Sequence, residues 1–232
     1  MTIIQKNIMH VRQQIEHAAV QAGRTTLDVQ LLAVSKTKPV AQIKEAYMAG
    51  QRLFGENYVQ ESIEKIQLIK DDCSFNDPIC WYFIGPLQSN KTRLVAENFD
   101  WVQSVDRFKI AQRLSAQRPT NLTPLNICLQ INISAEASKS GTTLTQIMEL
   151  AAQVSLLENL TLRGIMAIPE KTQDQAILSQ QFKALHHIYL KLQTLYPEVD
   201  TLSMGMSADM QLAIASGSTM VRIGTDIFGR RN

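Results

Sequence analysis

The feature that most constrains the fold of this chain is a regular alternation between short apolar runs and segments with helical spacing. An apolar run of this kind, rich in β-branched residues and bounded by turn residues, is typical of a strand buried on both faces of a parallel sheet. The predicted strands are a run within residues 29–36, which ends on Lys36, and then residues 51–54, 80–84, 101–105, 126–133, 162–168, 201–204 and 220–223.

Eight strands that alternate with helices over short connections predict a single (β/α)8 barrel of the TIM type. A doubly wound open sheet shows the same alternation, but it usually has fewer strands, and no G-x-G-x-x-G follows the first strand. No low-complexity linker interrupts the series, so we expect residues 1–232 to form one domain. Apolar residues at helical spacing between Ile4 and Ala19 predict an extra N-terminal helix, which we expect to plug or flank the closed bottom of the barrel.

Composition and charge exclude several classes of partner. The 232 residues carry a formal net charge of +2 with no block of lysine or arginine, so neither nucleic acid nor an anionic membrane is an implied partner. Cys73, Cys80 and Cys128 form no CxxC pair, and we expect free thiols in a reducing compartment rather than a disulfide or metal framework. The N-terminal segment is too charged for a signal peptide, and no apolar stretch approaches a membrane span. These features favour a cytoplasmic protein.

Lys36 stands at the carboxyl end of the first predicted strand, where α/β proteins place their chemistry. Its ammonium group could simply extend into solvent while its carbon chain packs below. Alternatively, a partly desolvated lysine can lose its proton and attack an aldehyde or ketone, which forms a Schiff base. Lys38, beside Pro39, is interpreted as a loop charge.

The ends of the last two predicted strands indicate a phosphate site. Ser207 stands at the start of the helix expected after the seventh strand, where unpaired N–H groups and the helix dipole favour an anion. Gly224 and Thr225 follow the eighth strand and offer close backbone approach and a hydroxyl donor. Barrels of this type commonly bind phosphate at these two loops. Taken singly, Ser207 could instead cap its helix and Gly224 could turn the chain.

Arg222 lies inside an apolar strand, where a guanidinium needs an acceptor. Asp209 or Asp226 could be a structural partner, or Arg222 could face the ring nitrogen of a cofactor. A Schiff-base lysine, an arginine opposite a pyridine nitrogen and a phosphate site together indicate pyridoxal 5′-phosphate. Glu56 and Asn57, at the end of the second strand, could hold the cofactor's ring hydroxyl or cap the next helix.

Six segments of the chain resemble the pyridoxal phosphate homeostasis protein family, whose fold is similar to the barrel domain of alanine racemase. They span nearly the whole chain in order: AVSKTKP at 33–39, FGENYVQE at 54–61, FIGPLQSNK at 83–91, LRGIM at 162–166, SMGMSAD at 203–209 and GSTMVRIGTDIFG at 217–229. The resemblance implies that Lys36 carries pyridoxal phosphate as a Schiff base and that Arg222 faces the pyridine nitrogen. It also implies that Ser207, Gly224 and Thr225 hold the phosphate.

Bound cofactor does not by itself imply catalysis. Racemisation needs an acid or base on each face of the substrate, and Lys36 supplies one. In the racemases that the chain resembles, the second group comes from an additional domain of a partner subunit, and no such domain is expected after the eighth strand. We therefore expect a carrier, a monomer rather than a dimer, that holds the cofactor reversibly and hands it to pyridoxal-phosphate-dependent apo-enzymes.

Two enzymatic hypotheses remain open at this point. Tyr82 stands where the family usually has histidine, and it could serve as the second acid or base of a small amino-acid racemase or lyase. A class I aldolase, in which Lys36 attacks the carbonyl group of a sugar phosphate, would also fit a barrel with a lysine and a phosphate site.

Overall fold

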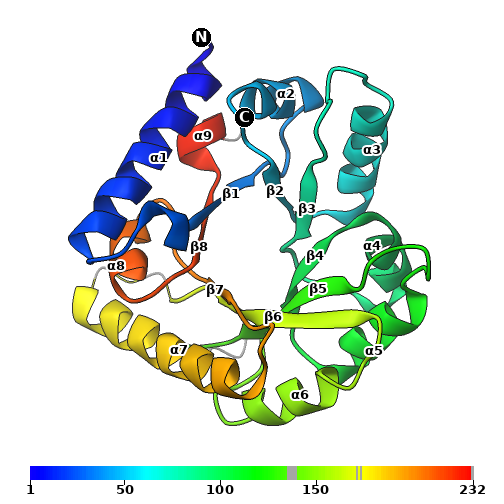
Figure 1. Ribbon diagram of the computed structural model, residues 1–232, viewed down its shortest axis with the longest axis vertical. Coiled ribbons are helices and arrows are strands. Elements are labelled where there is room, and N and C mark those ends of the chain that lie inside the picture. The colour runs from blue at the N-terminus through cyan, green and yellow to red at the C-terminus, as the bar shows by residue number, and fades with distance from the viewer. Residues whose placement is uncertain (135–139, 171, 173, 231–232) are drawn as a thin grey trace.

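In the computed structural model, which describes residues 1–134, 140–170, 172 and 174–230, eight parallel strands close into a barrel in chain order (Figure 1). The predicted (β/α)8 barrel is therefore confirmed. β1 pairs with both β2 and β8, which closes the sheet on itself. The strands are β1 (Gln30–Val34), β2 (Leu53–Glu56), β3 (Cys80–Phe83), β4 (Trp101–Val105), β5 (Leu125–Ile131), β6 (Leu160–Ala167), β7 (Thr201–Ser203) and β8 (Met220–Ile223).

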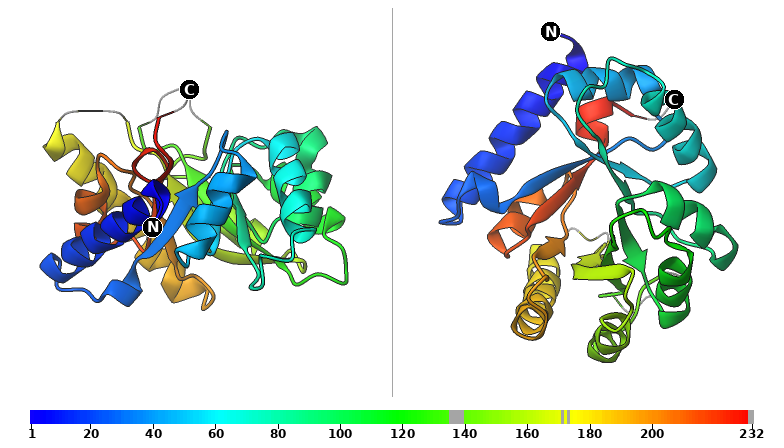
Figure 2. Two further views of the ribbon diagram at one scale, coloured as in Figure 1. Left: turned by 90° about the horizontal axis from the view of Figure 1, so that it is seen from above. Right: turned by 45° about the vertical axis from the view of Figure 1, so that its right-hand side comes forward.

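The helices form a ring outside the barrel, as the views in Figures 1 and 2 show. Short 3-10 turns, η1 (Thr26–Asp28) and η2 (Ser89–Lys91), precede β1 and α4. Within the described residues, no helix combines the length and the apolar character that crossing a membrane requires. The helices that follow the strands are α2 (Val40–Met48), α3 (Val59–Lys70), α4 (Thr92–Asn98), α5 (Phe108–Gln117), α6 (Ile147–Val154), α7 (Gln175–Leu195), α8 (Met210–Ala215) and α9 (Thr225–Phe228).

The extra N-terminal helix α1 (Ile3–Gln21) covers the side of the barrel and not its bottom. It packs against α2, α8 and α9 (Figure 1). α8 and α9 have only six and four residues, so they leave part of the wall at β8 and β1 uncovered. The expectation that this helix plugs the bottom is wrong, because the part of the apolar barrel wall that α8 and α9 leave uncovered lies at the side, and α1 covers it there. The side of α1 that faces the barrel buries Ile4, Ile8, Val11, Ile15, Ala18 and Ala19.

Two apolar clusters hold the barrel together. The larger one lies between the outer face of the strands and the helices. A smaller cluster draws its members from β1, β3, β4, β5, β6 and β8, and consists of Leu32, Tyr82, Trp101, Cys128, Met166 and Met220. Because side chains alternate along a strand, Arg222 projects to the same side as Met220, two residues nearer the carboxyl end of β8. Arg222 therefore caps this inner apolar layer on the side of the strand ends.

One predicted strand is shifted. β2 begins two residues later than the predicted 51–54. The side-chain amide of Gln51 donates to the carbonyl oxygens of Leu31 and Leu53 at 2.8 and 2.7 Å. Asp106 is of a residue type that often caps a helix, but it does not cap α5. Arg107 occupies the N-cap position, and Asp106 binds its guanidinium at 2.7 Å instead.

Candidate cofactor site

The predicted site residues follow four strands that are neighbours in the barrel, β7, β8, β1 and β2. Ser207 follows β7, Gly224 and Thr225 follow β8, Lys36 follows β1 and Asn57 follows β2. Because all strands are parallel, these positions lie on one side of the face formed by the carboxyl ends. Residues as far apart in the sequence as Lys36 and Thr225 are thus brought to one region, and Arg222 projects into the barrel below it.

Lys36 is half-buried and lies in a tight turn directly after β1. The amide of Lys38 donates to the carbonyl oxygen of Ser35 at 3.0 Å, which closes this turn. Thr37 within it has a φ of 61°, a left-handed conformation that β-branched residues rarely adopt. Such a conformation costs about 1–3 kcal/mol and persists only where the surroundings hold it, which is common at functional sites.

Lys38 is more than the loop charge that its position suggests. Its Nζ donates to the carbonyl oxygens of Phe228 and Arg230, at 3.1 and 3.0 Å. Lys38 therefore fastens the end of α9 to the turn after β1. The two lysines of the Ser-Lys-Thr-Lys segment thus differ in role, because Lys38 is engaged by backbone acceptors of the C-terminal segment.

Arg222 is only 5% exposed and makes two hydrogen bonds to neutral acceptors. Its Nη1 donates to Ser203 Oγ at 2.7 Å, and its Nη2 donates to the carbonyl oxygen of Ala167 at 2.8 Å. Of the two alternatives left open by the sequence, a bond to an aspartate is not found, since within the described residues neither Asp209 nor Asp226 is hydrogen-bonded to Arg222. Burial lowers the pKa of Arg222 to about 10, and the charge of Asp209 offsets only part of this effect. A guanidinium has five N–H donors, so donors remain for a further acceptor.

The region predicted to bind phosphate lies in two turns at the surface. Ser207 is exposed and precedes α8 by three residues, so it does not start the helix as predicted. Asp209 occupies the N-cap position instead, and its carboxylate accepts the Met206 amide at 2.5 Å. Ser207 therefore presents its hydroxyl from a turn that Asp209 closes.

Gly224 and Thr225 complete this region from the β8 side. Thr225 is exposed and is the first residue of α9, whose first N–H groups have no partner within the helix. A Cβ added at Gly224 would lie 3.2 Å from the carbonyl oxygen of Val34, a tight contact, so glycine favours the close approach of the end of β8 to β1. Two hydroxyl groups and exposed amides are suitable donors for a phosphate.

Glu56 and Asn57 do not cap α3, which begins at Val59 with no side-chain hydrogen bond at its N-cap. Glu56 is fully buried and binds Lys65 and Ser35, and burial raises its pKa despite the nearby charge of Lys65. Oδ1 of Asn57 is buried and has no hydrogen-bond partner among the described residues. A buried acceptor without a donor indicates a group that a ligand can complete. The predicted ring-hydroxyl contact therefore suits Asn57 better than Glu56.

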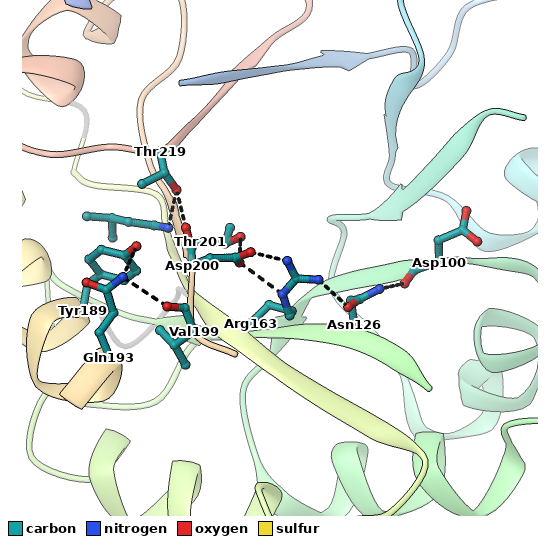
Figure 3. A network of polar contacts seen from close by, with 10 residues as sticks. Asp100, Asn126, Arg163, Tyr189, Gln193, Val199, Asp200, Thr201 and Thr219 are labelled. Atoms are coloured by element: carbon teal, nitrogen blue, oxygen red, sulfur yellow. Dashed lines mark hydrogen bonds and ion pairs between the residues drawn. The ribbon is translucent and has the colours of Figure 1, made fainter. Parts of the chain in front are cut away.

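The side chain of Tyr82 is turned toward the amino end of the barrel, away from Lys36, where it lines a pocket with Gln30 and Thr219. Its ring is 2% exposed and stacks on Trp101, the first residue of β4, with ring centroids 5.0 Å apart. The guanidinium carbon of Arg163 lies 4.8 Å from the centroid of the Trp101 ring. Arg163 also binds Asp200 and Asn126, in the network that Figure 3 shows. Burial also raises the pKa of Tyr82 far above that of an ordinary tyrosine. Tyr82 is therefore not placed to act as a second acid or base opposite Lys36.

Comparison with known proteins establishes the family. The family described as "Alanine racemase, N-terminal domain" matches residues 8–232. A pyridoxal phosphate homeostasis protein of Vibrio alginolyticus is 56% identical over 232 residues, which cover 100% of this chain and 99% of the relative. The chain belongs to the pyridoxal phosphate homeostasis protein family. The resemblance found in the sequence is thus confirmed.

A second relative and a solved structure agree with this assignment. The pyridoxal phosphate homeostasis protein of Escherichia coli K12 is 52% identical over 232 residues, 100% of this chain and 98% of the relative. The structure of PipY from Synechococcus elongatus PCC7942 with PLP bound has a TM-score of 0.82 and 35% identity, and the match covers 97% of this chain and 100% of PipY. The family resemblance therefore extends over the whole barrel.

Sequence reasoning missed the residues that support Arg222. Ser203 Oγ, which accepts from Arg222, donates to Gln103 Oε1 at 2.8 Å, and Gln103 Nε2 donates to the sulfur of Met220 at 3.0 Å. A signal was available, because Gln103 is a polar residue in the middle of a strand that is otherwise mostly apolar. Polar residues at inward-facing positions of barrel strands are candidates for such support.

Proposed function

We propose that this protein binds pyridoxal 5′-phosphate through a reversible Schiff base on Lys36 and acts in cytoplasmic homeostasis of the cofactor, with little or no catalysis. The names of its relatives and the PLP-bound structure of PipY support the cofactor. The observation that carries the proposal is the gathering of an amine, a buried guanidinium and two hydroxyl-bearing turns at one side of the barrel. These are the groups that an aldehyde, a pyridine nitrogen and a phosphate require.

Each residue has a distinct role in this proposal. Lys36 forms the covalent bond to the aldehyde carbon, and Arg222 directs a remaining N–H donor at the ring nitrogen. Asn57 accepts a hydrogen bond from the ring hydroxyl with Oδ1, which has no partner among the described residues. Ser207, Gly224 and Thr225 hold the phosphate through their hydroxyl and amide groups. When bound, the cofactor supplies an aldehyde that exchanges between amines.

The surroundings of Lys36 favour holding and releasing the cofactor over catalysis. An arginine that remains charged at the ring nitrogen donates a hydrogen bond and leaves that nitrogen unprotonated, which weakens the ring as an electron sink. Racemisation would also need a second acid or base, and the side chain of Tyr82 is turned toward the other end of the barrel. Exchange of the lysine amine for an incoming amine offers a release step, so pyridoxal-phosphate-dependent apo-enzymes are the proposed recipients.

The test is a borohydride-trapping experiment followed by peptide mass mapping. Purified protein is incubated with pyridoxal phosphate, reduced and digested. We expect the added mass on the peptide that contains Lys36. The Lys36→Ala variant should lose the label completely, while Lys38→Ala, two residues away, should retain it at Lys36. A label on Lys38, or no label on the native protein, would contradict the proposal.

A second arm tests the carrier role. Loaded protein is mixed with an apo-enzyme that depends on pyridoxal phosphate, and recovery of that enzyme's activity is followed over time. We expect reactivation by the loaded wild-type protein. We expect deuterium exchange at the α-carbon of free amino acids in deuterated buffer to be slow or undetectable. Fast and complete exchange would favour an enzyme over a carrier.

A further inference from the structure

A buried group of charged side chains contacts the turn that carries Lys36. We call Glu56, Glu61 and Lys65 the Lys65 cluster. Glu56 comes from β2, and the other two residues lie one helical turn apart in α3. The Lys65 ammonium binds Oε1 of Glu56 at 2.9 Å and Oε1 of Glu61 at 2.5 Å. The side chains of Glu56 and Lys65 are 0% and 8% exposed, and that of Glu61 is 31% exposed.

Lys65 is held by three groups at once. Its Nζ donates to the carbonyl oxygen of Ser35 and to Glu56 Oε1, each at 2.9 Å. Its charge also pairs with the carboxylate of Glu61. Moving Lys65 would leave buried acceptors unsatisfied, which is costly. The cluster is therefore a fixed point in the structure.

The cluster binds both residues that flank Lys36. Ser35 is held through its carbonyl oxygen by Lys65 and through its hydroxyl, which donates to Glu56 Oε1 at 2.7 Å. Thr37 is held from the other side, because its amide donates to Glu61 Oε1 at 2.7 Å. The backbone from which the Lys36 side chain projects is thus fixed at both neighbours.

The bond from Thr37 to Glu61 also holds a strained conformation. Thr37 has a φ of 61°, which its branched side chain disfavours. Without an acceptor for its amide, the peptide between Lys36 and Thr37 is free to rotate toward an allowed conformation. That rotation would change the direction in which the Lys36 side chain points.

We propose that Glu61 and Lys65 are positioning residues for Lys36, holding the strained turn so that the lysine amine reaches the aldehyde of the cofactor. This inference rests on the proposed function, since it concerns the same lysine. Glu61 and Lys65 are four residues apart in α3, like an ordinary ion pair on a helix surface, but here the pair would also fix the position of a reactive lysine. Such surface pairs usually contribute little to stability.

The test compares Glu61→Ala with Glu61→Gln, because only the glutamine keeps an oxygen that can accept the Thr37 amide. Stopped-flow mixing with pyridoxal phosphate, borohydride quenching and peptide mapping give the rate at which Lys36 is labelled. We expect Glu61→Ala to be about 10- to 100-fold slower than wild type, since small misplacements of a reacting group have effects of this size. Glu61→Gln should lie within about threefold of wild type. Labelling of Glu61→Ala at the wild-type rate would overturn the proposal, as would equal rates for the two variants.

Hydrogen exchange of the Thr37 amide provides a readout that does not depend on the cofactor. It should be faster in Glu61→Ala and near wild type in Glu61→Gln, and equal exchange in both variants would overturn the proposal.

Lys65→Met should slow labelling of Lys36 at least as much as Glu61→Ala. Its matched control is Lys44→Met, which removes a lysine from the partly exposed ion pair with Asp72 and should change neither rate. If Lys65→Met does not fold, the comparison of Glu61→Ala with Glu61→Gln alone tests the proposal. Absence of any Lys36 label in wild type would instead refute the proposed function, while amide exchange would still report on the turn.

Discussion

Each end of the barrel contains a partly or fully buried arginine, and the two arginines have different hydrogen-bond and ion-pair partners. At the amino end, Arg163 binds the carboxylate of Asp200 and the side-chain oxygen of Asn126 (Figure 3). Its guanidinium also lies over the ring of Trp101. At the carboxyl end, Arg222 is more deeply buried and bonds to a hydroxyl and a backbone carbonyl. One arginine is neutralised by the protein itself, and the other is not.

The pKa values of the two guanidinium groups follow this difference. Burial lowers the pKa of Arg163, but the hydrogen bonds and charge of Asp200 outweigh burial and raise it. Burial lowers the pKa of Arg222 to about 10, because no carboxylate is in contact with it among the described residues. In barrels of this type the amino end serves stability and the carboxyl end serves function. In the proposed function, the incompletely compensated charge of Arg222 is the place where the cofactor provides an acceptor that the protein does not.

The largest effect that we expect concerns how well the amino end of the barrel shields its side chains from reagents in solvent. Cys80 is the first residue of β3, and burial raises the pKa of its thiol to about 12 from an ordinary 9. Cys73 is exposed. Since the thiolate is the reactive form and the raised pKa leaves little of it at neutral pH, a thiol reagent should modify Cys80 about 100- to 1000-fold more slowly than the exposed Cys73. Mass spectrometry of the labelled protein over time measures both rates.

Labelling in urea provides the control, because all three thiols should then react at similar rates. Modification of Cys80 in the native protein as fast as Cys73 would show that the amino end does not shield this half-buried thiol. The contrast between a shielded end and the proposed ligand-binding end would then be lost.

Exchanging each arginine for methionine should separate the two roles. Arg222→Met should weaken pyridoxal phosphate binding about 10- to 100-fold, since a hydrogen bond to a charged group contributes about 1.5–3 kcal/mol. Its free energy of unfolding should stay equal or rise, because a poorly compensated buried charge is removed. Arg163→Met should leave the cofactor's Kd unchanged and lower the free energy of unfolding by about 1 kcal/mol, as Asp200 is half exposed.

Cofactor titration and urea unfolding of both variants measure these quantities. The comparison fails if Arg222→Met unfolds more easily and binds normally, because Arg222 would then be the structural arginine.

These residues also show what could be predicted from the sequence. The barrel follows from the order of apolar runs, and the candidate residues Lys36 and Arg222 follow from their place at a strand end or inside an apolar strand. Both inferences are local, because they need only a strand's boundaries and the chemistry of one side chain.

The contacts of these residues could not be predicted in the same way. Ser203 and Ala167 become partners of Arg222 through the closure of the barrel, which brings residues 19 and 55 positions away in the sequence into contact. Lys65 has the spacing of a surface ion pair with Glu61, and nothing in that spacing reveals that α3 turns this pair toward Ser35. Such contacts depend on how elements pack, which a pattern along one chain does not specify.

A smaller effect tests the phosphate end of the site. Ser207→Ala and Thr225→Ala should each raise the Kd for pyridoxal phosphate about fivefold, since each removes one hydrogen bond of about 1 kcal/mol. Neither variant should change the affinity for pyridoxal, which lacks the phosphate group. Fluorescence titration with both ligands measures the effect. A parallel loss for pyridoxal would mean that these hydroxyls act on the fold and not on the phosphate.

The smallest effect concerns the carboxylate beneath Lys36. Burial raises the pKa of Glu56 above its ordinary 4.5, with the charge of Lys65 opposing this only in part. A carboxyl group with a raised folded-state pKa stabilises the fold below pH 4.5, and this contribution is lost as the pH rises through the raised pKa.

Glu56→Gln cannot ionise, and its side-chain oxygen still accepts from Ser35 and Lys65. The free energy of unfolding of Glu56→Gln minus that of wild type should therefore increase with pH above 4.5, as urea unfolding at a series of pH values would show. Asp100, a carboxyl at the amino end whose pKa burial also raises, is present in both proteins and cancels from this difference. A difference that falls with pH would mean that the ion pair with Lys65 outweighs burial, and that the carboxyl end compensates this charge as fully as Asp200 compensates Arg163.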